Sequence, residues 1–157
     1  MRPQAAPDRA SIGKALAVVL FVACGIAPGA RPAAGAGDVV VIVNAANSTS
    51  ALAAAEVSSL FLKKTEAWPD KTPASPVDLD ERSPARESFS RQIHSKRTAA
   101  IKSYWQKMIF SGREVPPPEK ASPEEVVRFV RSHPGGIGYV PAGTPLGSGV
   151  KILEVRP

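Results

Sequence analysis

Strand-like and helix-like segments alternate along this chain, and the alternation is the feature that most constrains its fold. Residues 39–43 form an uncharged, β-branched run, which is typical of a buried strand. Residues 50–64 then place Val57, Leu60 and Phe61 on one helical face and end in two lysines. A strand followed directly by a helix indicates the start of an α/β unit.

Local signals predict the next two elements. The run from Pro76 to Asp80 alternates apolar and acidic residues, which predicts a half-exposed strand with Asp78 and Asp80 on its outer face. We expect these two carboxylates to be solvated rather than catalytic. Ser83 followed by Pro84 predicts a helix start. The serine hydroxyl can accept a backbone N–H as the N-cap, and proline fits the first helical position because its missing N–H is not needed there.

The second half of the chain predicts two more helices and two closing strands. Apolar residues recur at helical spacing over 101–109, and a Ser-Gly pair ends that helix. A capping box in 122–125 predicts the next helix. The glycine-rich stretch 135–138 follows a helix and opens a strand, so it predicts a turn with positive φ and not a dinucleotide-binding loop. Strands are expected over 137–140 and 150–155, giving about four strands and four helices in a small three-layer α/β lobe.

The first 36 residues have the pattern of a secretory signal peptide. Arg2, Arg9 and Lys14 precede the apolar run 15–23, and small residues follow up to Ala36. The apolar run is shorter than the roughly 20 residues that a membrane span needs. We therefore predict cleavage after Ala36, a mature chain without a transmembrane span, and a periplasmic or secreted location.

Cys24 leaves a second possibility open for the N-terminus. Residues 21–24, Phe-Val-Ala-Cys, loosely resemble a lipobox, in which Cys24 would carry a lipid and become the first mature residue. Under the favoured cleavage after Ala36, Cys24 is removed with the signal peptide. The mature chain then has no cysteine, so it has no disulfide and no thiolate for catalysis or metal binding.

Cleavage also changes the composition on which functional arguments rest. The mature chain keeps 121 residues, enough for about one domain, and its net charge falls from +6 to +3. Its basic residues are scattered among acidic ones, which argues against a nucleic-acid partner. His94 and His133 have no spacing that defines a metal site or a catalytic triad, so we expect no metal, no cofactor and no enzymatic activity.

One predicted helix start could hold an oxyanion. Arg82, Ser83 and Arg86 surround a strand end that runs into a helix N-terminus, where free N–H groups and the helix dipole attract negative charge. The simpler alternative is that Ser83 only caps the helix, while the two arginines pair with Glu81 and Glu87 on the surface.

A second polar loop is a candidate for the same role. Asn47, Ser48 and Thr49 lie between the first strand and the first helix, at the carboxyl end of the strand. Ligands of open α/β sheets commonly bind at that end. Both loops are therefore predicted as tentative oxyanion-binding residues.

Several motifs occur in a fixed order between residues 39 and 155. They are Ser59–Lys64, Trp68–Asp70, Pro76–Asp78, Ser83 with Phe89, Tyr104–Trp105, Phe110–Gly112, Glu125–Val127 and Pro134–Val140. In this order and spacing they resemble the phosphate ABC transporter substrate-binding proteins, the PstS-like branch of the type II periplasmic binding fold. The resemblance assigns residues 37–157 to a periplasmic-binding-protein-like domain.

This resemblance implies a function as well as a fold. It implies an exported, non-enzymatic solute-binding protein that holds phosphate or a similar oxyanion and works with an ABC permease or another envelope protein. The family's phosphate loop corresponds to residues 80–86, where Ser83 matches and the arginine is displaced. Full binding proteins are about twice as long as the mature chain, which makes this a single-lobe member. The alternative is a single-lobe envelope interaction module that has lost solute binding.

Overall fold

A mixed four-stranded sheet organises residues 38–157, the part of the chain that the computed structural model describes. Its strand order is β3 (Ser75–Pro76), β6 (Gly136–Pro141), β1 (Val39–Asn44) and β7 (Val150–Ile152). Strand β1 lies antiparallel to β6 and β7, whereas β3 lies parallel to β6. The buried strand predicted at residues 39–43 is confirmed. The predicted signal peptide and Cys24 lie outside the described residues.

The last strand of the chain bends at Leu153 and serves two sheets. Leu153 donates its N–H to the Val41 carbonyl at 2.9 Å, and beyond it β8 (Glu154–Arg156) pairs in parallel with β2 (Ala51–Ala53). The single strand predicted over 150–155 is therefore two strands. Residues 51–53, predicted as helix, form β2, because long-range pairing decides the state of a short run that has no strong preference.

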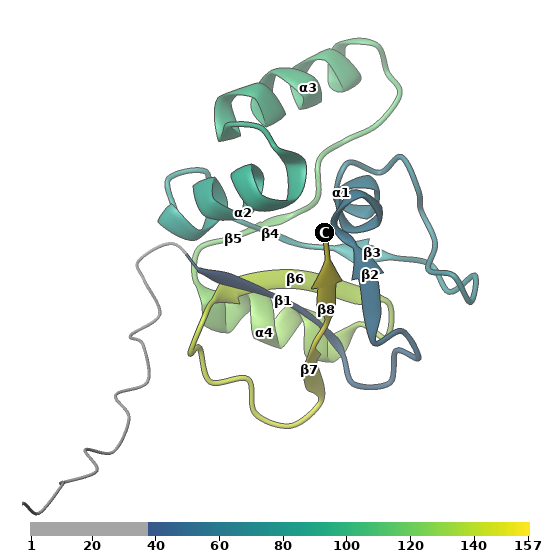
Figure 1. Ribbon diagram of the computed structural model, residues 1–157. Helices are drawn as coiled ribbons and strands as arrows, with labels where there is room; N and C mark the ends of the chain where they lie inside the picture. The colour runs from purple at the N-terminus through teal and green to yellow at the C-terminus, as the bar shows by residue number, and fades with distance from the viewer. Residues whose placement is uncertain (1–37) are drawn as a thin grey trace, which may run out of the picture. The chain divides into compact units, whose positions relative to one another are not determined.

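Residues 38–157 form four helices, the number predicted. Helix α4 (Pro123–Ser132) contacts β6 and β1 on one face, and α2 (Pro84–His94) covers the other face beside α1 (Ala54–Phe61) (Figure 1). Helix α3 (Thr98–Phe110) packs against α2 on the side away from the sheet. The predicted capping box is present in part: the Ser122 hydroxyl accepts the Glu125 N–H at 3.3 Å, whereas the Glu125 carboxylate accepts the N–H of Ala121 and not that of Ser122.

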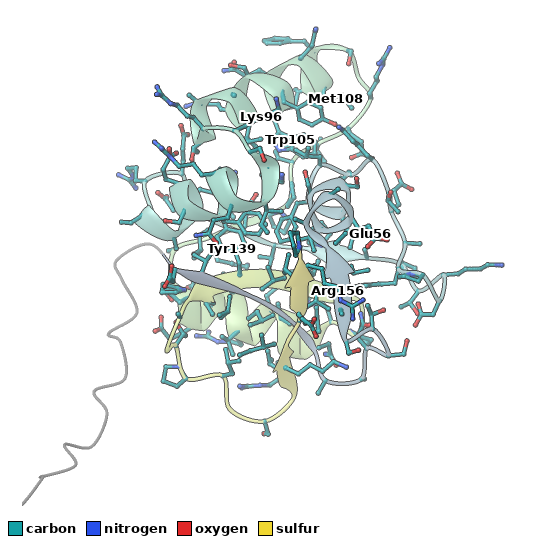
Figure 2. The ribbon with its side chains drawn as sticks, in the orientation of Figure 1. Glu56, Lys96, Trp105, Met108, Tyr139 and Arg156 are labelled. Carbon is teal, nitrogen blue, oxygen red and sulfur yellow. The ribbon has the colours of Figure 1, made fainter. Side chains whose placement is uncertain are left out.

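A buried aromatic cluster joins the sheet to α1 and α2. Tyr139 projects from β6 (Figure 2) and stacks on Phe89 of α2, with ring centroids 3.8 Å apart and an interplanar angle of 5°. Phe61 of α1 packs against Phe89 at 4.7 Å. All three side chains are at most 2% exposed. Because the rings come from three elements, they fix how α1 and α2 sit on the sheet.

Two glycines in residues 135–138 allow close packing rather than a special backbone conformation. A Cβ at Gly138 would lie 2.6 Å from Val126 Cγ1 of α4, and one at Gly135 would lie 1.9 Å from the Pro73 carbonyl oxygen. Neither glycine is among the residues with positive φ. The predicted positive-φ turn is therefore wrong, and the glycines are needed because neighbouring atoms fill the space of a side chain.

Candidate functional site

Residues 77–79, directly after β3, are buried, contrary to the prediction of an exposed edge. Strand β4 (Asp78–Leu79) pairs in parallel with β5 (Glu119–Lys120), which lies about 40 residues further along the chain. Asp78 is 5% exposed, so its predicted place on an outer face is wrong. Helix α2 packs over this strand and converts the expected solvated carboxylate into a buried one.

Arg86 is the cation that faces Asp78. Its guanidinium lies 2.7 Å from Asp78 Oδ1 and donates to the Leu79 carbonyl at 2.8 Å, with Glu119 at 3.6 Å. Arg86 is itself 5% exposed, which excludes the alternative in which it pairs with Glu87 on the surface. Glu87 instead pairs with Arg91 at 2.7 Å.

Tyr139 completes the buried network. Its hydroxyl donates to Asp78 Oδ1 at 2.6 Å and accepts the Leu79 N–H at 3.3 Å. Burial raises the pKa of Asp78 to about 6, although Arg86 and the Tyr139 hydrogen bond act to lower it. Burial, followed by the charge of Asp78, also raises the pKa of Tyr139. The hydroxyl of Tyr139 is therefore a lasting donor to the carboxylate.

This network predicts a pH dependence of stability. Between pH 3.8 and about 6, the folded chain retains a proton on Asp78 that the unfolded chain has released. A group with a raised carboxyl pKa lowers the stability as the pH rises through that window. We expect Asp78→Asn to remove this contribution. The unfolding free energy of the variant, relative to that of the wild type, should therefore rise from pH 4 to pH 6.

Urea unfolding at a series of pH values measures the effect. Asp38→Asn, which makes the same change at an exposed residue, is the matched control variant. Parallel profiles for Asp78→Asn and the wild type across this window would contradict the assignment of the proton to Asp78.

Arg82 and Ser83 lie on the exposed turn that leads into α2. Arg82 is folded back onto Asp80, with Nε 3.1 Å from Oδ1, and its side chain is 91% exposed. Ser83 is the N-cap residue as predicted, but its hydroxyl makes no capping hydrogen bond. Its carbonyl accepts the N–H groups of Arg86 at 3.0 Å and Glu87 at 3.4 Å. The Ser83 hydroxyl has no hydrogen-bond partner among the described residues.

A small cavity adjoins this end of α2, under the neighbouring helix α3. Its volume is about 220 Å³, and it holds two cations, Arg86 and Lys102, together with two carboxylates, Glu81 and Glu119. Lys102 pairs with Glu81 at 2.9 Å. The remaining lining residues are Thr98, Trp105, Gln106, Ile109 and Pro116. The cavity therefore has balanced charges, two cations against two carboxylates, beside an apolar wall formed by Trp105, Ile109 and Pro116.

The second predicted loop uses its polar groups internally. Asn47 Oδ1 accepts the Thr49 N–H at 2.8 Å, and the Asn47 carbonyl accepts from Lys151. The Ser48 hydroxyl donates to Asp70 at 2.9 Å. These contacts hold the loop against β7 and the loop that contains Asp70.

The two predicted loops do not form one site. Because β1 is antiparallel to β6 and β3 is parallel to β6, the loop after β1 and the loop after β4 leave opposite ends of the sheet (Figure 1). Residues 47–49 and residues 82–86 are therefore separate candidates. Sequence analysis missed the contribution of Tyr139 and Glu119 to the second of these, since both join it through strand pairing far along the chain.

Neither a metal-binding cluster nor a membrane-spanning helix occurs among residues 38–157. No group of three or more His, Cys, Asp and Glu side chains in residues 38–157 could hold a metal ion. Within the same range, no helix has the length and apolar character needed to cross a bilayer.

Solved structures share this arrangement of strands and helices. An ABC-type phosphate transport receptor from Vibrio cholerae matches 74% of this chain and 45% of its own, with a TM-score of 0.58 and 17% identity. PstS from Borrelia burgdorferi matches 75% of this chain and 47% of its own, with a TM-score of 0.53 and 16% identity. No protein-family profile and no curated protein matches the chain.

These matches establish the fold. The chain has the fold of type II periplasmic binding proteins, and within that class it resembles the substrate-binding proteins of phosphate ABC transporters. The resemblance predicted from sequence motifs is confirmed at this level. The chain spans less than half the length of the two solved structures, which fits the prediction of a single lobe.

Proposed function

We propose that the mature chain is an exported, non-enzymatic solute-binding-like protein, related to the substrate-binding components of phosphate ABC transporters. The fold supports this proposal, and the matched proteins are transport receptors rather than enzymes. The proposed ligand is phosphate or a similar oxyanion, and the proposed partner is an ABC permease or another envelope protein.

The observation that carries the ligand proposal is the unpaired hydroxyl of Ser83. Its hydroxyl has no partner among the described residues, and it stands at the N-terminus of an 11-residue helix. Such an end attracts anions through the helix dipole. The exposed guanidinium of Arg82 lies one residue earlier and is held only by an exposed pair with Asp80. An oxyanion at Ser83 could recruit it, since an exposed ion pair is weak.

Other features of the same turn limit the affinity. Pro84 has no N–H to donate, and Arg86 is buried in its contacts with Asp78 and Leu79. The carboxylates of Asp80 and Glu81 also repel an anion. We therefore expect weak, rapidly exchanging binding of phosphate, at the millimolar level (about −4 kcal/mol).

Phosphate titration of residues 37–157 tests the proposal, with NMR shifts of backbone amides as the readout and sodium chloride holding ionic strength constant. We expect saturable shifts around residues 83–86. Ser83→Ala should weaken binding about tenfold or more, because it removes a hydrogen bond to a charged ligand. Ser103→Ala changes an exposed serine on α3 and should leave binding intact. Absence of saturable shifts, or equal binding by Ser83→Ala, would refute a site at Ser83.

A second candidate function has its own supporting observation. Arg86, one of the two arginines of the predicted site, is 5% exposed, and its Nη1 already contacts Asp78 and the Leu79 carbonyl. This favours a single-lobe interaction module that binds another envelope protein and no solute. Purification of one stoichiometric protein partner, together with no affinity for phosphate or sulfate, would support the module.

A further inference from the structure

Three large apolar side chains are exposed at the C-terminal end of α3 and in the loop that follows it. Phe110 is 90% exposed, Val115 61% and Ile109 50%. We call these three residues the apolar tip. Helix α3 lies on the side of α2 away from the sheet, so the tip belongs to the periphery of the described fold (Figure 1). Ile109 also lines the cavity under α3, so Phe110 is the most exposed apolar side chain of the tip. A large apolar side chain left in water can mark an interaction surface.

The backbone of the tip is held in a defined shape. Gly112 has a φ of 65°, and its N–H donates to the Ile109 carbonyl at 3.0 Å. The Arg113 N–H reaches back to the Met108 carbonyl at 3.1 Å. These two hydrogen bonds form a Schellman motif, which ends α3 cleanly. The exposure of Phe110 therefore comes from a structured helix end.

The side chains of Met108 and Trp105 anchor the same helix from its inner face. Both belong to a small apolar cluster with Leu62 and Ile101, and both are labelled on α3 in Figure 2. The inner face of α3 is thus already covered. Phe110 does not belong to that cluster.

Two cations lie close to the tip in the sequence, Lys107 in the last turn of α3 and Arg113 in the turn after it. Lys107 and Arg113 flank the tip, and neither side chain has an ion-pair or hydrogen-bond partner within residues 38–157. The carboxylate of Glu114, the residue after Arg113, is neutralised by Lys63 at 3.1 Å.

We propose that the apolar tip docks on an anionic lipid surface, with Phe110 entering the headgroup region and Lys107 and Arg113 contacting lipid phosphates. Exposed apolar side chains flanked by unpaired cations are the composition that binds bilayer interfaces. A stable protein–protein contact buries about 800 Å² on each partner, much more than three side chains offer. This inference goes beyond the proposed function and does not depend on phosphate binding at Ser83.

Vesicle co-sedimentation of residues 37–157, which contain the whole described core, tests the proposal. We expect binding to vesicles of equimolar phosphatidylcholine and phosphatidylglycerol, and much weaker binding to phosphatidylcholine alone. Phe110→Ser should lower the partition coefficient about tenfold or more. Lys107→Ala and Arg113→Ala should each lower it about fivefold.

Two control variants match these changes. Ile152→Ser removes an apolar side chain that is 57% exposed on β7, and Arg128→Ala removes an exposed charge from α4. Both should bind vesicles like the wild type, and circular dichroism should show that every variant is folded. Equal binding by Phe110→Ser and the wild type, or no binding to the anionic vesicles, would overturn the proposal. A dimer in solution that Phe110→Ser disrupts, without vesicle binding, would overturn it in favour of a second copy of the chain.

Discussion

We expect Arg86→Met to lower the free energy of unfolding by about 3–5 kcal/mol, because it leaves the Asp78 carboxylate buried without its cation. The two side chains are 6% and 8% exposed, and Arg86 Nη1 lies 2.7 Å from Asp78 Oδ1. Tyr139 alone would then remain as a side-chain donor to the carboxylate. Urea unfolding at pH 7.5, where Asp78 is ionised, measures the loss.

The double variant Asp78→Leu/Arg86→Met separates the cost of an unpaired charge from the value of the ion pair. Replacing both partners of a buried pair by apolar groups is often neutral or stabilising. We expect the double variant to be more stable than Arg86→Met alone. A double variant that is less stable than either single variant would show that the pair itself is a major source of stability.

Phe89→Ala should have an effect of similar size, for a different reason. The side chain is 1% exposed and contacts the rings of Phe61 and Tyr139, so its removal leaves a cavity between α2 and the sheet. We expect a loss of about 3–5 kcal/mol in the free energy of unfolding. Thermal unfolding followed by circular dichroism would show the corresponding fall in Tm.

Phe110→Ala is the matched control for this change. It removes the same ring from a side chain that is 90% exposed, so the free energy of unfolding should change by less than about 0.5 kcal/mol. Equal destabilisation by the two variants would mean that Phe110 has a packing partner in the folded chain, and it would also remove the basis for the apolar tip.

Local signals in the sequence were sufficient for the elements that carry them. The β-branched run of β1 and the Ser-Pro starts of α2 and α4 give the correct positions, because capping and side-chain periodicity depend on near neighbours. The same signals failed at β2 and at the bend in the last strand. Pairing between residues about 100 positions apart decides those conformations, and no local pattern reports it.

In the candidate site, too, the features set by local sequence were predictable and those set by long-range packing were not. The helix start at Ser83 was predictable, whereas the burial of Asp78 was not. Alternation predicts one exposed face for a strand, but both faces of β4 are covered, by α2 and by the neighbouring sheet and α4. Arg86 could be recognised as a candidate ligand residue, but its partner could not, because Asp78 becomes its neighbour only when α2 packs on β4.

The separation of the two polar loops bears on how long a solute would stay bound. Within residues 38–157, an anion at Ser83 meets protein from one side only, since the loop with Asn47 leaves the opposite end of the sheet. A ligand held from one side exchanges with the solvent quickly, and differences in affinity between related complexes arise mostly in the dissociation rate. This lobe by itself would therefore sample the anion concentration around it rather than retain and carry an anion, and a long residence time would require a second protein surface to close over Ser83.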